Sequence, residues 1–563
     1  MGVDPAIFAK LVTGNLFPLT RDMEDMSSSQ TGDSNRDDTR DQQHALISSL
    51  SHADAYPHRV SEIRLIETHI SWVILTGDYA YKIKKCVDFG FLDFSTLAKR
   101  KKFCEEELRL NGRLAPTLYL DVVPICGPAE KASMGGTGEA IEYAVKMRQF
   151  DLHNTFDHLL AQDALTADHM EETAEMLARF HSSIAIADET SAVGARFGTP
   201  EAIRQPSMEN FDQLAASLLS QKNQHGLDAP LSQLRQWTAD HHEALIPTFQ
   251  ARKRGGFIRE CHGDLHLRNI VIWEGRVTPF DGIEFNDNLR WIDVISELAF
   301  LLMDLDDHQQ PALARQLLNR YLSLTGDYGG LQVLRYYQVY RAMVRAKVAG
   351  LRLGQTENQN EVSQQLQEIS NYLQLAERYT QPQKPVLIIT HGLSGSGKTY
   401  LSKQLCLATE LIHLRSDVER KRCFGLSETA QSHSAPSAGI YTPEATQKVY
   451  QHLMQLSHEI LLAGFSVLVD ATFLQRQHRD LFKSLARELH LPFTILHCEA
   501  NDDILLQRIR ARQTEGKDAS EANEAILKKQ HDQAVLDADE IGDTHSIQTA
   551  EEIDIENLLT VLM

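Results

Sequence analysis

The feature that most constrains the fold of this chain is the segment Gly392-Leu-Ser-Gly-Ser-Gly-Lys-Thr399. It follows the apolar run 386–390 and precedes a pattern expected for a helix. In that context glycines let backbone N–H groups point at a phosphate, and the N-terminus of the following helix adds favourable charge. The segment therefore predicts a phosphate-binding loop at the end of a buried strand in an α/β sheet.

Each residue type in this loop has an expected role. Lys398 is expected to reach the β- and γ-phosphates of ATP, and Thr399 is expected to ligate Mg²⁺. The residues predicted to contact the nucleotide are Gly392, Ser394, Gly395, Ser396, Gly397, Lys398 and Thr399.

Carboxylates at the ends of neighbouring strand-like runs complete this predicted site. Asp470 ends the run 467–469 and is expected to support Mg²⁺, whereas Ala471 follows where many hydrolytic motors carry a glutamate. That difference favours a kinase over an ATPase motor. Asp417 closes the run 412–414, where it could bind or deprotonate a substrate, or simply cap a helix.

A pair of arginines follows the last of these runs. Arg508 and Arg512 are spaced to share one face of a helix, so both could stabilise the transferring phosphate. The alternative is a solvated basic helix face. We interpret Asp417, Arg508 and Arg512 as catalytic candidates.

A second and unrelated signature lies earlier in the chain, at His262-Gly-Asp264-Leu-His-Leu-Arg-Asn269. Asp264 could orient or deprotonate an attacking hydroxyl, and Asn269 could hold a metal ion. Asp281 follows an apolar strand and could bind the Mg²⁺ that bridges the phosphates. These are the roles that kinase-type phosphoryl transfer requires.

Such a site also needs a lysine on a strand and a carboxylate from the next helix. Lys82 in Tyr79-Ala-Tyr-Lys82 fits that arrangement, with Lys84 as the fallback. Glu107 lies closest to the buried stripe of the predicted helix 97–114, and Glu106 is slightly farther from it. No Gly-x-Gly-x-x-Gly loop precedes Lys82.

The length and the net charge of the chain limit the classes of protein to which it can belong. At 563 residues the chain exceeds what one hydrophobic core supports. Its net charge of -21, from 77 acidic and 56 basic residues, argues against nucleic-acid or anionic-membrane partners. No apolar run is long enough for a membrane span, and no secretion signal is visible. The seven scattered cysteines indicate reduced thiols, so we expect a cytoplasmic protein.

Composition also predicts the domain organisation. Residues 1–44 are polar and are expected to be largely disordered, with a possible short helix at 6–19. A kinase-type domain is expected over 45–378, with a mostly helical stretch at 151–250. A proline-bearing linker over 379–385 then leads to a P-loop domain over 386–563.

Residues 45 to 375 resemble the aminoglycoside phosphotransferase family, through the His262 to Asn269 segment and Asp281. Residues 290–293 resemble its structural aspartate region and 142–147 its hinge. The resemblance implies a bilobal protein-kinase-like fold, with Asp264 as catalytic base and with Asn269 and Asp281 as Mg²⁺ ligands.

Residues 385 to 563 resemble P-loop kinases of the zeta-toxin, gluconate-kinase and chloramphenicol-phosphotransferase type, which are loosely grouped as AAA-type ATP-binding domains. The resemblance rests on the Gly392 loop, Asp417, Asp470 and the two arginines. It implies that Asp417 is the substrate base and that Arg508 and Arg512 belong to a lid. The predicted fold class is thus a multidomain α/β and α+β protein, whose C-terminal part is a parallel sheet flanked by helices.

Together these patterns predict a bifunctional, ATP-dependent and Mg²⁺-dependent phosphotransferase acting on small hydroxylated molecules. One alternative is a nucleotide-gated regulatory protein in which one domain is a pseudokinase, and another is a toxin-like kinase of a nucleotide sugar. A polyamine acceptor would need an acidic pocket, to which Glu284, Asp287 and the acids of the helical stretch 151–250 could contribute. The motifs leave open both acceptors, any coupling between the domains, a resistance or toxin role, and the oligomeric state.

Overall fold

The structure is a computed structural model that describes residues 33–89, 92–188, 190–191, 194–219, 226–353, 358–432, 438–515, 519–531 and 536–562. The chain divides into two compact units. Unit 1 comprises the residues up to 169, 179–309 and 333–380, and unit 2 comprises 170–178, 310–332 and 381–563. The sequence predicted one boundary at 379–385, whereas the structure assigns two earlier stretches to unit 2 as well.

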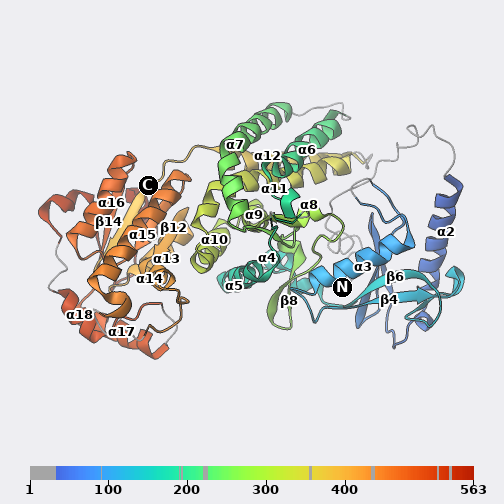
Figure 1. Cartoon of the computed structure of the whole chain (residues 1–563), viewed down its shortest axis with the longest axis horizontal. Helices are drawn as coiled ribbons and strands as arrows, with labels where there is room; N and C mark the ends of the chain where they lie inside the picture. The colour runs from blue at the N-terminus through green and yellow to red at the C-terminus, as the bar shows by residue number, and fades with distance from the viewer. Residues whose placement is uncertain are drawn as a thin grey trace. The chain divides into compact units, whose positions relative to one another are not determined.

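Unit 1 begins with an antiparallel sheet in the order β1-β2-β3-β6-β4-β5. Its strands are β1 (Arg64–Glu67), β2 (Ser71–Leu75), β3 (Tyr79–Lys84), β4 (Tyr119–Cys126), β5 (Ser133–Met134) and β6 (Ala140–Arg148). Helix α3 (Leu97–Asn111) starts at Thr96, whose side chain accepts a hydrogen bond from the Lys99 N–H. The helix lies across β4 and β6 (Figure 1) and shares an apolar core with them.

Helix α2 (Asp33–Ser49) covers the end of the segment that the sequence predicted to be disordered. The helix is held by contacts distant in sequence, because the Gln43 amide donates to Glu142 (2.8 Å) and accepts from the Cys86 N–H (2.8 Å). Leu46 and Leu50 are buried in a core that includes β2 and β3. Local composition does not reveal such contacts. Residues 1–32, including the short helix expected at 6–19, lie outside the described residues.

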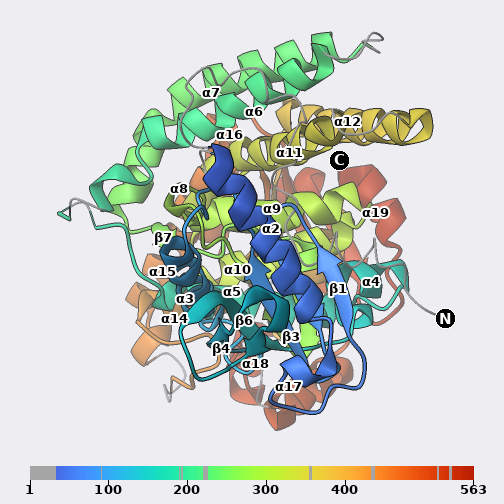
Figure 2. The ribbon, with the colours of Figure 1, turned by 90° about the vertical axis from the view of Figure 1, so that its right-hand side faces the viewer.

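The rest of unit 1 is mainly helical. Its helices are α4 (Phe156–Ala161), α5 (Ala167–Ser183, in part), α6 (Pro200–Leu219), α7 (Asp228–Arg254), α8 (Asp287–Arg290), α9 (Val294–Asp307), α11 (Leu331–Leu353, in part) and α12 (Gln359–Thr380). Figure 2 shows α6 and α7 side by side with α11 and α12 next to them, and apolar side chains of these helices form one core. Two short antiparallel strand pairs flank the loops that contain the site residues. They are β7 (Ile258–Glu260) with β10 (Trp291–Asp293), and β8 (Ile270–Trp273) with β9 (Arg276–Pro279).

Unit 2 contains a fully parallel sheet in the order β12-β13-β11-β14-β15. Its strands are β11 (Leu387–His391), β12 (Leu411–Arg415), β13 (Ser466–Asp470), β14 (Phe493–Glu499) and β15 (Thr544–Gln548). Helices α13 (Lys398–Ala408), α14 (Ser416–Cys423), α15 (Pro443–Leu462) and α16 (Arg476–Glu488) surround the strands (Figure 1). The remaining helices after residue 381 are α17 (Asp502–Glu515), α18 (Glu524–Gln530) and α19 (Ile555–Leu562). The predicted parallel α/β fold is confirmed.

Helix α10 (Pro311–Thr325) also belongs to unit 2 and packs on α13 and β12. The Asn319 amide donates to the Leu411 carbonyl (3.1 Å) and accepts from the His413 N–H (2.7 Å). Arg315 donates to the Leu407 carbonyl (2.9 Å). The segment 310–332 therefore completes the edge of the parallel sheet.

Two predictions about the whole chain can be compared with this fold. Within the described residues, no helix combines the length and the apolar character that crossing a membrane would require. All seven cysteines are free thiols, and five of them are buried.

Candidate active sites

The loop after β7 places Asp264 at the centre of the first site. Asn269 holds it in place, because its Nδ2 donates both to the Asp264 carboxylate (3.1 Å) and to the Asp264 carbonyl (3.0 Å). Burial by itself would raise the pKa of Asp264, but the neighbouring His266, at 3.4 Å, and His262 lower it below its usual value. The carboxylate is therefore ionised at neutral pH and able to accept a proton.

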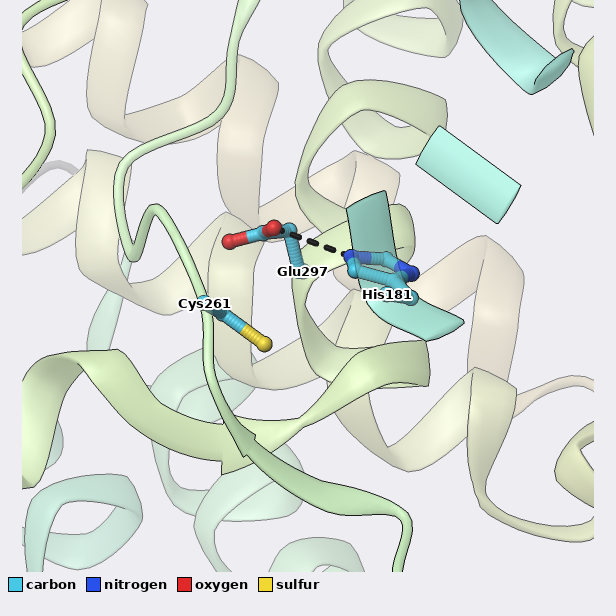
Figure 3. Close-up of side chains that lie close together, drawn as sticks. All are labelled: His181, Cys261 and Glu297. Atoms are coloured by element: carbon cyan, nitrogen blue, oxygen red, sulfur yellow. Dashed lines mark hydrogen bonds and ion pairs between the residues drawn. The ribbon is translucent and has the colours of Figure 1, made fainter. Parts of the chain in front are cut away.

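Glu297, on the first turn of α9, holds this loop from behind. One carboxylate oxygen accepts the N–H groups of His262 (2.7 Å) and Gly263 (2.8 Å), and the other lies 3.0 Å from His181 Nε2 (Figure 3). Gly263 has a φ of 90°, and a Cβ there would lie 2.7 Å from the Leu289 carbonyl oxygen. The loop thus requires both the glycine and the buried carboxylate.

Sequence reasoning missed Glu297. It pointed instead to the region of Asp293, which pairs with Arg252 (2.6 Å) and caps α9 by accepting the Ile295 N–H. The available signal was an acid four residues after Asp293, within the mainly apolar first half of the helix.

His181, Cys261 and Glu297 lie close enough together to hold a metal ion. However, both Glu297 oxygens already accept hydrogen bonds. Burial, reinforced by the charge of Glu297, raises the pKa of the Cys261 thiol well above its usual value, so Cys261 is not a ready thiolate ligand. We interpret the cluster as support for the His262 loop.

Lys82, Glu107 and Asp281 meet as the sequence predicted. The Lys82 Nζ lies 2.6 Å from Asp281 and 2.9 Å from Glu107. Lys84 also pairs with Glu107 (2.7 Å), but its other partner is Glu284. Lys82 joins the helix carboxylate to Asp281, so its position matches that of the predicted lysine, whereas Lys84 pairs with Glu107 and Glu284.

The charges of Lys82 and Glu107 are stabilised by their neighbours, whereas burial raises the pKa of Asp281 despite the charge of Lys82. Burial alone would lower the pKa of Lys82, but Asp281 and Glu107 raise it well above its usual value. Burial alone would raise the pKa of Glu107, but Lys82 and Lys84 lower it to about 2. The residue expected nearby, Glu106, pairs instead with Arg109 (2.5 Å).

The residues of the first site fit a magnesium ion. The buried Asn269 Oδ1 has no hydrogen-bond partner, and hard cations prefer such oxygens together with carboxylates like Asp281. Next to Lys82 and Asp281 lies an apolar cavity of about 20 Å³. It is lined mainly by Val73, Leu75, Ala80, Leu118, Met147 and Phe280.

The second site lies at the carboxyl end of the central strand β11. The strands β12 and β13 lie on one side of β11 and the later strands β14 and β15 lie on the other, and open parallel sheets bind ligands at such a switch point. Gly397 has a φ of 83°, and a Cβ there would lie 2.9 Å from the Thr549 side chain. The Lys398 Nζ donates to the Leu393 carbonyl (2.6 Å). Burial lowers the pKa of Lys398, although Asp470 opposes that effect.

A cavity of about 280 Å³ opens beside this loop. The predicted residues that line it are Ser394, Gly395, Gly397, Lys398, Thr399, Asp417, Asp470, Arg508 and Arg512. Gly392 and Ser396 are not among its lining residues. A Cβ on Gly392 would lie 2.5 Å from the Cys498 carbonyl oxygen, and the Ser396 Oγ lies 3.4 Å from Lys398 Nζ. These two residues therefore support the conformation of the loop without lining the cavity.

Asp470 is a buried, ionised carboxylate. Burial would raise its pKa, but a hydrogen bond and the charge of His413 (3.3 Å), together with Arg415 and Thr399, lower the pKa to about 2. His413 was not predicted from the sequence. Asp417 lies in the first turn of α14, whose N-cap is Arg415, so Asp417 does not serve as that cap.

The two predicted arginines on α17 differ in their contacts. Arg508 donates to the Thr549 carbonyl (2.6 Å) and to the Gly395 carbonyl (3.3 Å), so it braces the loop. Arg512 has Nε and Nη2 atoms that are buried without a hydrogen-bond partner. Unpaired buried donors that line a cavity point to an anionic ligand. Sequence reasoning did not anticipate Tyr441, Tyr450, Glu521 and Gln530 in the lining.

The comparisons with known proteins agree with this division. Residues 94–335 match the model of the phosphotransferase enzyme family, and residues 387–536 match the model of an AAA domain. The chain joins a phosphotransferase-family domain to a P-loop kinase domain. The resemblance drawn from the motifs is therefore confirmed, and the two matched domains support a phosphotransferase activity.

An uncharacterized protein of Mycobacterium tuberculosis strain H37Rv is 28% identical over 473 residues, which cover 83% of this chain and 90% of the relative. A choline/ethanolamine kinase family protein of Mesorhizobium loti is similar in structure, at 11% identity and a TM-score of 0.34, covering 60% of this chain and 99% of its own. A gluconokinase of Sinorhizobium meliloti is 16% identical with a TM-score of 0.22, covering 32% of this chain and 89% of its own. Likenesses at this level assign no substrate.

Proposed function

We propose that this chain is a bifunctional, ATP-dependent phosphotransferase that acts on small hydroxylated molecules. The observation that supports it is that each unit, taken by itself, contains a full set of phosphoryl-transfer residues around its own cavity. By charge and composition we also propose that the protein is cytoplasmic and has neither nucleic-acid nor membrane partners.

In the first site, Asp264 accepts the proton of the acceptor hydroxyl and Lys82 contacts the phosphates of ATP. Asn269 and Asp281 would hold Mg²⁺, which when bound neutralises charge on the phosphates. Glu107 keeps Lys82 charged and oriented, and Glu297 fixes the backbone from which Asp264 projects. The surroundings of Asp264 and Lys82 keep both groups charged, as these two roles require.

In the second site, the Gly392 loop and Lys398 contact the phosphates, and Arg512 adds a charge at the transferring group. Thr399 and Asp470 would hold Mg²⁺ there. Asp417 accepts the proton of the acceptor hydroxyl. The absence of a glutamate after Asp470 supports transfer to an acceptor rather than to water.

The test uses the full-length chain with ATP and a bacterial metabolite extract, and mass spectrometry identifies the phosphorylated products. The variants are Asp264→Asn, Lys398→Ala and the double variant. We expect each single variant to lose a different set of products and the double variant to lose all of them. If Asp264→Asn left every product unchanged, the first site would be inactive as a kinase.

One observation favours the regulatory alternative for the first site. Lys82 is paired with Asp281, so the carboxylate expected to bind Mg²⁺ is already neutralised within the protein. A pseudokinase unit would retain that pair when nucleotide binds. ATP binding to the Lys398→Ala variant without any product would support this alternative.

A further inference from the structure

A second cavity in unit 1, of about 110 Å³, lies against Asp264 and is separate in its lining from the apolar cavity beside Lys82. Residues of α6, α9 and α11 form most of its wall. Its polar lining includes Glu209, Asn210, Gln213, Asn286, Tyr340, Arg341 and Lys347. Because it contacts the predicted base, it is the place for the acceptor if the proposed function holds.

Two amide side chains in this wall each have one buried atom without a hydrogen-bond partner among the described residues. Asn210 is only 2% exposed, and its Nδ2 has no hydrogen bond. Gln213 Oε1 is likewise buried and unpaired, although the Nε2 of the same side chain donates to Glu209 (2.7 Å). Leaving such groups buried and unpaired is unfavourable, so they point to a polar ligand.

The cavity also contains two buried cations. Arg341 is held by the Ser296 carbonyl (3.1 Å) and the Gly263 carbonyl (3.2 Å), and its guanidinium lies over the Phe300 ring. Lys347 is 7% exposed, and burial lowers its pKa to about 8 despite the opposing charge of Glu209. Both cations line the same cavity as the Asn210 amide.

Two of the acids that the sequence suggested for a cationic acceptor, Glu284 and Asp287, are engaged elsewhere, whereas Glu209 of the helical stretch 151–250 lines the cavity. Glu284 is buried in an ion pair with Lys84. Asp287 pairs with Arg290 and also lies 3.2 Å from Arg196. Neither carboxylate lines the cavity, so a polyamine would meet only Glu209 and the catalytic Asp264.

We propose, resting on the proposed function, that this cavity binds a hydroxylated acceptor through a carboxylate or phosphate group held by Lys347 and Asn210. Asp264 faces the acceptor hydroxyl at the other end of the ligand. In the transfer, the acceptor oxygen bonds to the terminal phosphorus of ATP, and the bond from that phosphorus to the ADP oxygen breaks. Asp264 takes the hydroxyl proton, and the products are ADP and the phosphorylated acceptor.

The experiment uses the full-length Lys398→Ala chain, in which the second site is silenced. A bacterial metabolite extract is separated by ion exchange into anionic, neutral and cationic fractions, and each is supplied with ATP. We expect phosphorylated product from the anionic fraction. Product from only the neutral or the cationic fraction would overturn the proposal while leaving the kinase activity of the site intact.

Variants then test the two anchoring residues on the acceptor found in the anionic fraction. Lys347→Met preserves the length of the side chain, and we expect it to raise the acceptor KM by about tenfold or more, as for loss of a charge-assisted hydrogen bond. Asn210→Asp should raise the KM as well, because it puts a carboxylate beside the anion. Lys101→Met, at an exposed lysine of α3, is the matched control and should change nothing.

Two further results would count against the proposal. The first would be an acceptor KM that is unchanged in both Lys347→Met and Asn210→Asp, when the melting temperatures of the two variants match that of the parent. This result would exclude the two residues as the anion anchor. No product from any fraction, with Asp264→Asn indistinguishable from its parent, would instead contradict the proposed function of the first site, and the acceptor proposal would fail with it.

Discussion

The two candidate sites of this chain balance their charges in opposite ways. In unit 1 the cations and carboxylates pair with each other: Lys82 contacts both Glu107 and Asp281. In unit 2 the cavity is larger, and Arg512 presents buried donors with no partner. The second site is thus preorganised for an anion, whereas the first must exchange an internal ion pair for contacts with its ligand.

The largest expected effect comes from removing the base of the first site. Asp264→Asn should lower the kcat of the unit 1 reaction by about 10²- to 10⁴-fold, because a positioned general base contributes that much. Quantifying products of both sites in one reaction measures it. Products of unit 2 should be unchanged, and a parallel fall in both would mean that the sites do not act independently.

Substitutions of the two arginines of α17 should distinguish an effect on the charge in the cavity from an effect on the stability of the fold. Arg512→Ala should lower the kcat of the unit 2 reaction by about 10²- to 10³-fold without lowering the melting temperature, because a preorganised charge is lost while its buried Nε and Nη2 donate to no other described residue. Kinetics and thermal unfolding of the same samples provide the measurement.

Arg508→Ala is the matched comparison, because it removes the donors to Thr549 and Gly395. We expect it to lower the stability of the folded chain by about 1–3 kcal/mol. Equal melting temperatures for the two variants would contradict the distinction between a bracing and a ligand-facing arginine.

Because of Glu297, the free energy of unfolding of unit 1 should depend on pH. Burial would raise its pKa, but hydrogen bonding and charge from His181, together with the backbone N–H groups, lower it below 4.5. A depressed carboxyl pKa stabilises the folded state above the unfolded-state value, and this contribution is lost as the pH falls through the folded-state pKa. Glu297→Gln should thus be destabilised by about 1–3 kcal/mol at pH 7.

Denaturant unfolding of the wild type and Glu297→Gln from pH 7 to pH 3 tests this. The difference between the two free energies of unfolding should shrink as the pH falls. A difference independent of pH would mean that shape, rather than the charge of Glu297, supports the loop.

The smallest effect is expected at the edge of the parallel sheet. Asn319→Ala removes the bonds to Leu411 and His413 and should destabilise unit 2 by about 1–2 kcal/mol. Gln367→Ala on the exposed face of α12 is the control and should stay within about 0.5 kcal/mol. Hydrogen exchange at the His413 amide measures the local effect, and equal protection in both variants would contradict it.

Much of the fold and of both sites could be predicted because motif chemistry is local in sequence. The residue types and spacing within the loop from Gly392 to Thr399 and the loop from His262 to Asn269 predict the conformation of each loop. They also predict the partner residues that each site requires, such as Asp470 for the first loop and Lys82 for the second. The residues that were missed act through tertiary contacts. Glu297 and His413 have no motif spacing, and each acquires its role only when the chain brings a loop or a carboxylate to it.

The acceptor cavity illustrates the same limit. Asn210 and Lys347 are 137 positions apart, and nothing in their neighbours distinguishes them from surface residues. Their burial beside Asp264 follows from the packing of α6 and α11. Conversely, Glu284 was suggested by its position after Asp281, but the pairing with Lys84 across the fold removes it from the cavity.

The place of α10 in unit 2 bears on the inheritance of this gene. Residues 310–332 lie before the helices 333–380 of unit 1, so the two units are interleaved along the chain. No single recombination point could pass on the whole of one unit without part of the other. A descendant that began near residue 381 would leave the Leu411 carbonyl and the His413 amide without the partner that Asn319 provides. We therefore expect the two units to be inherited together.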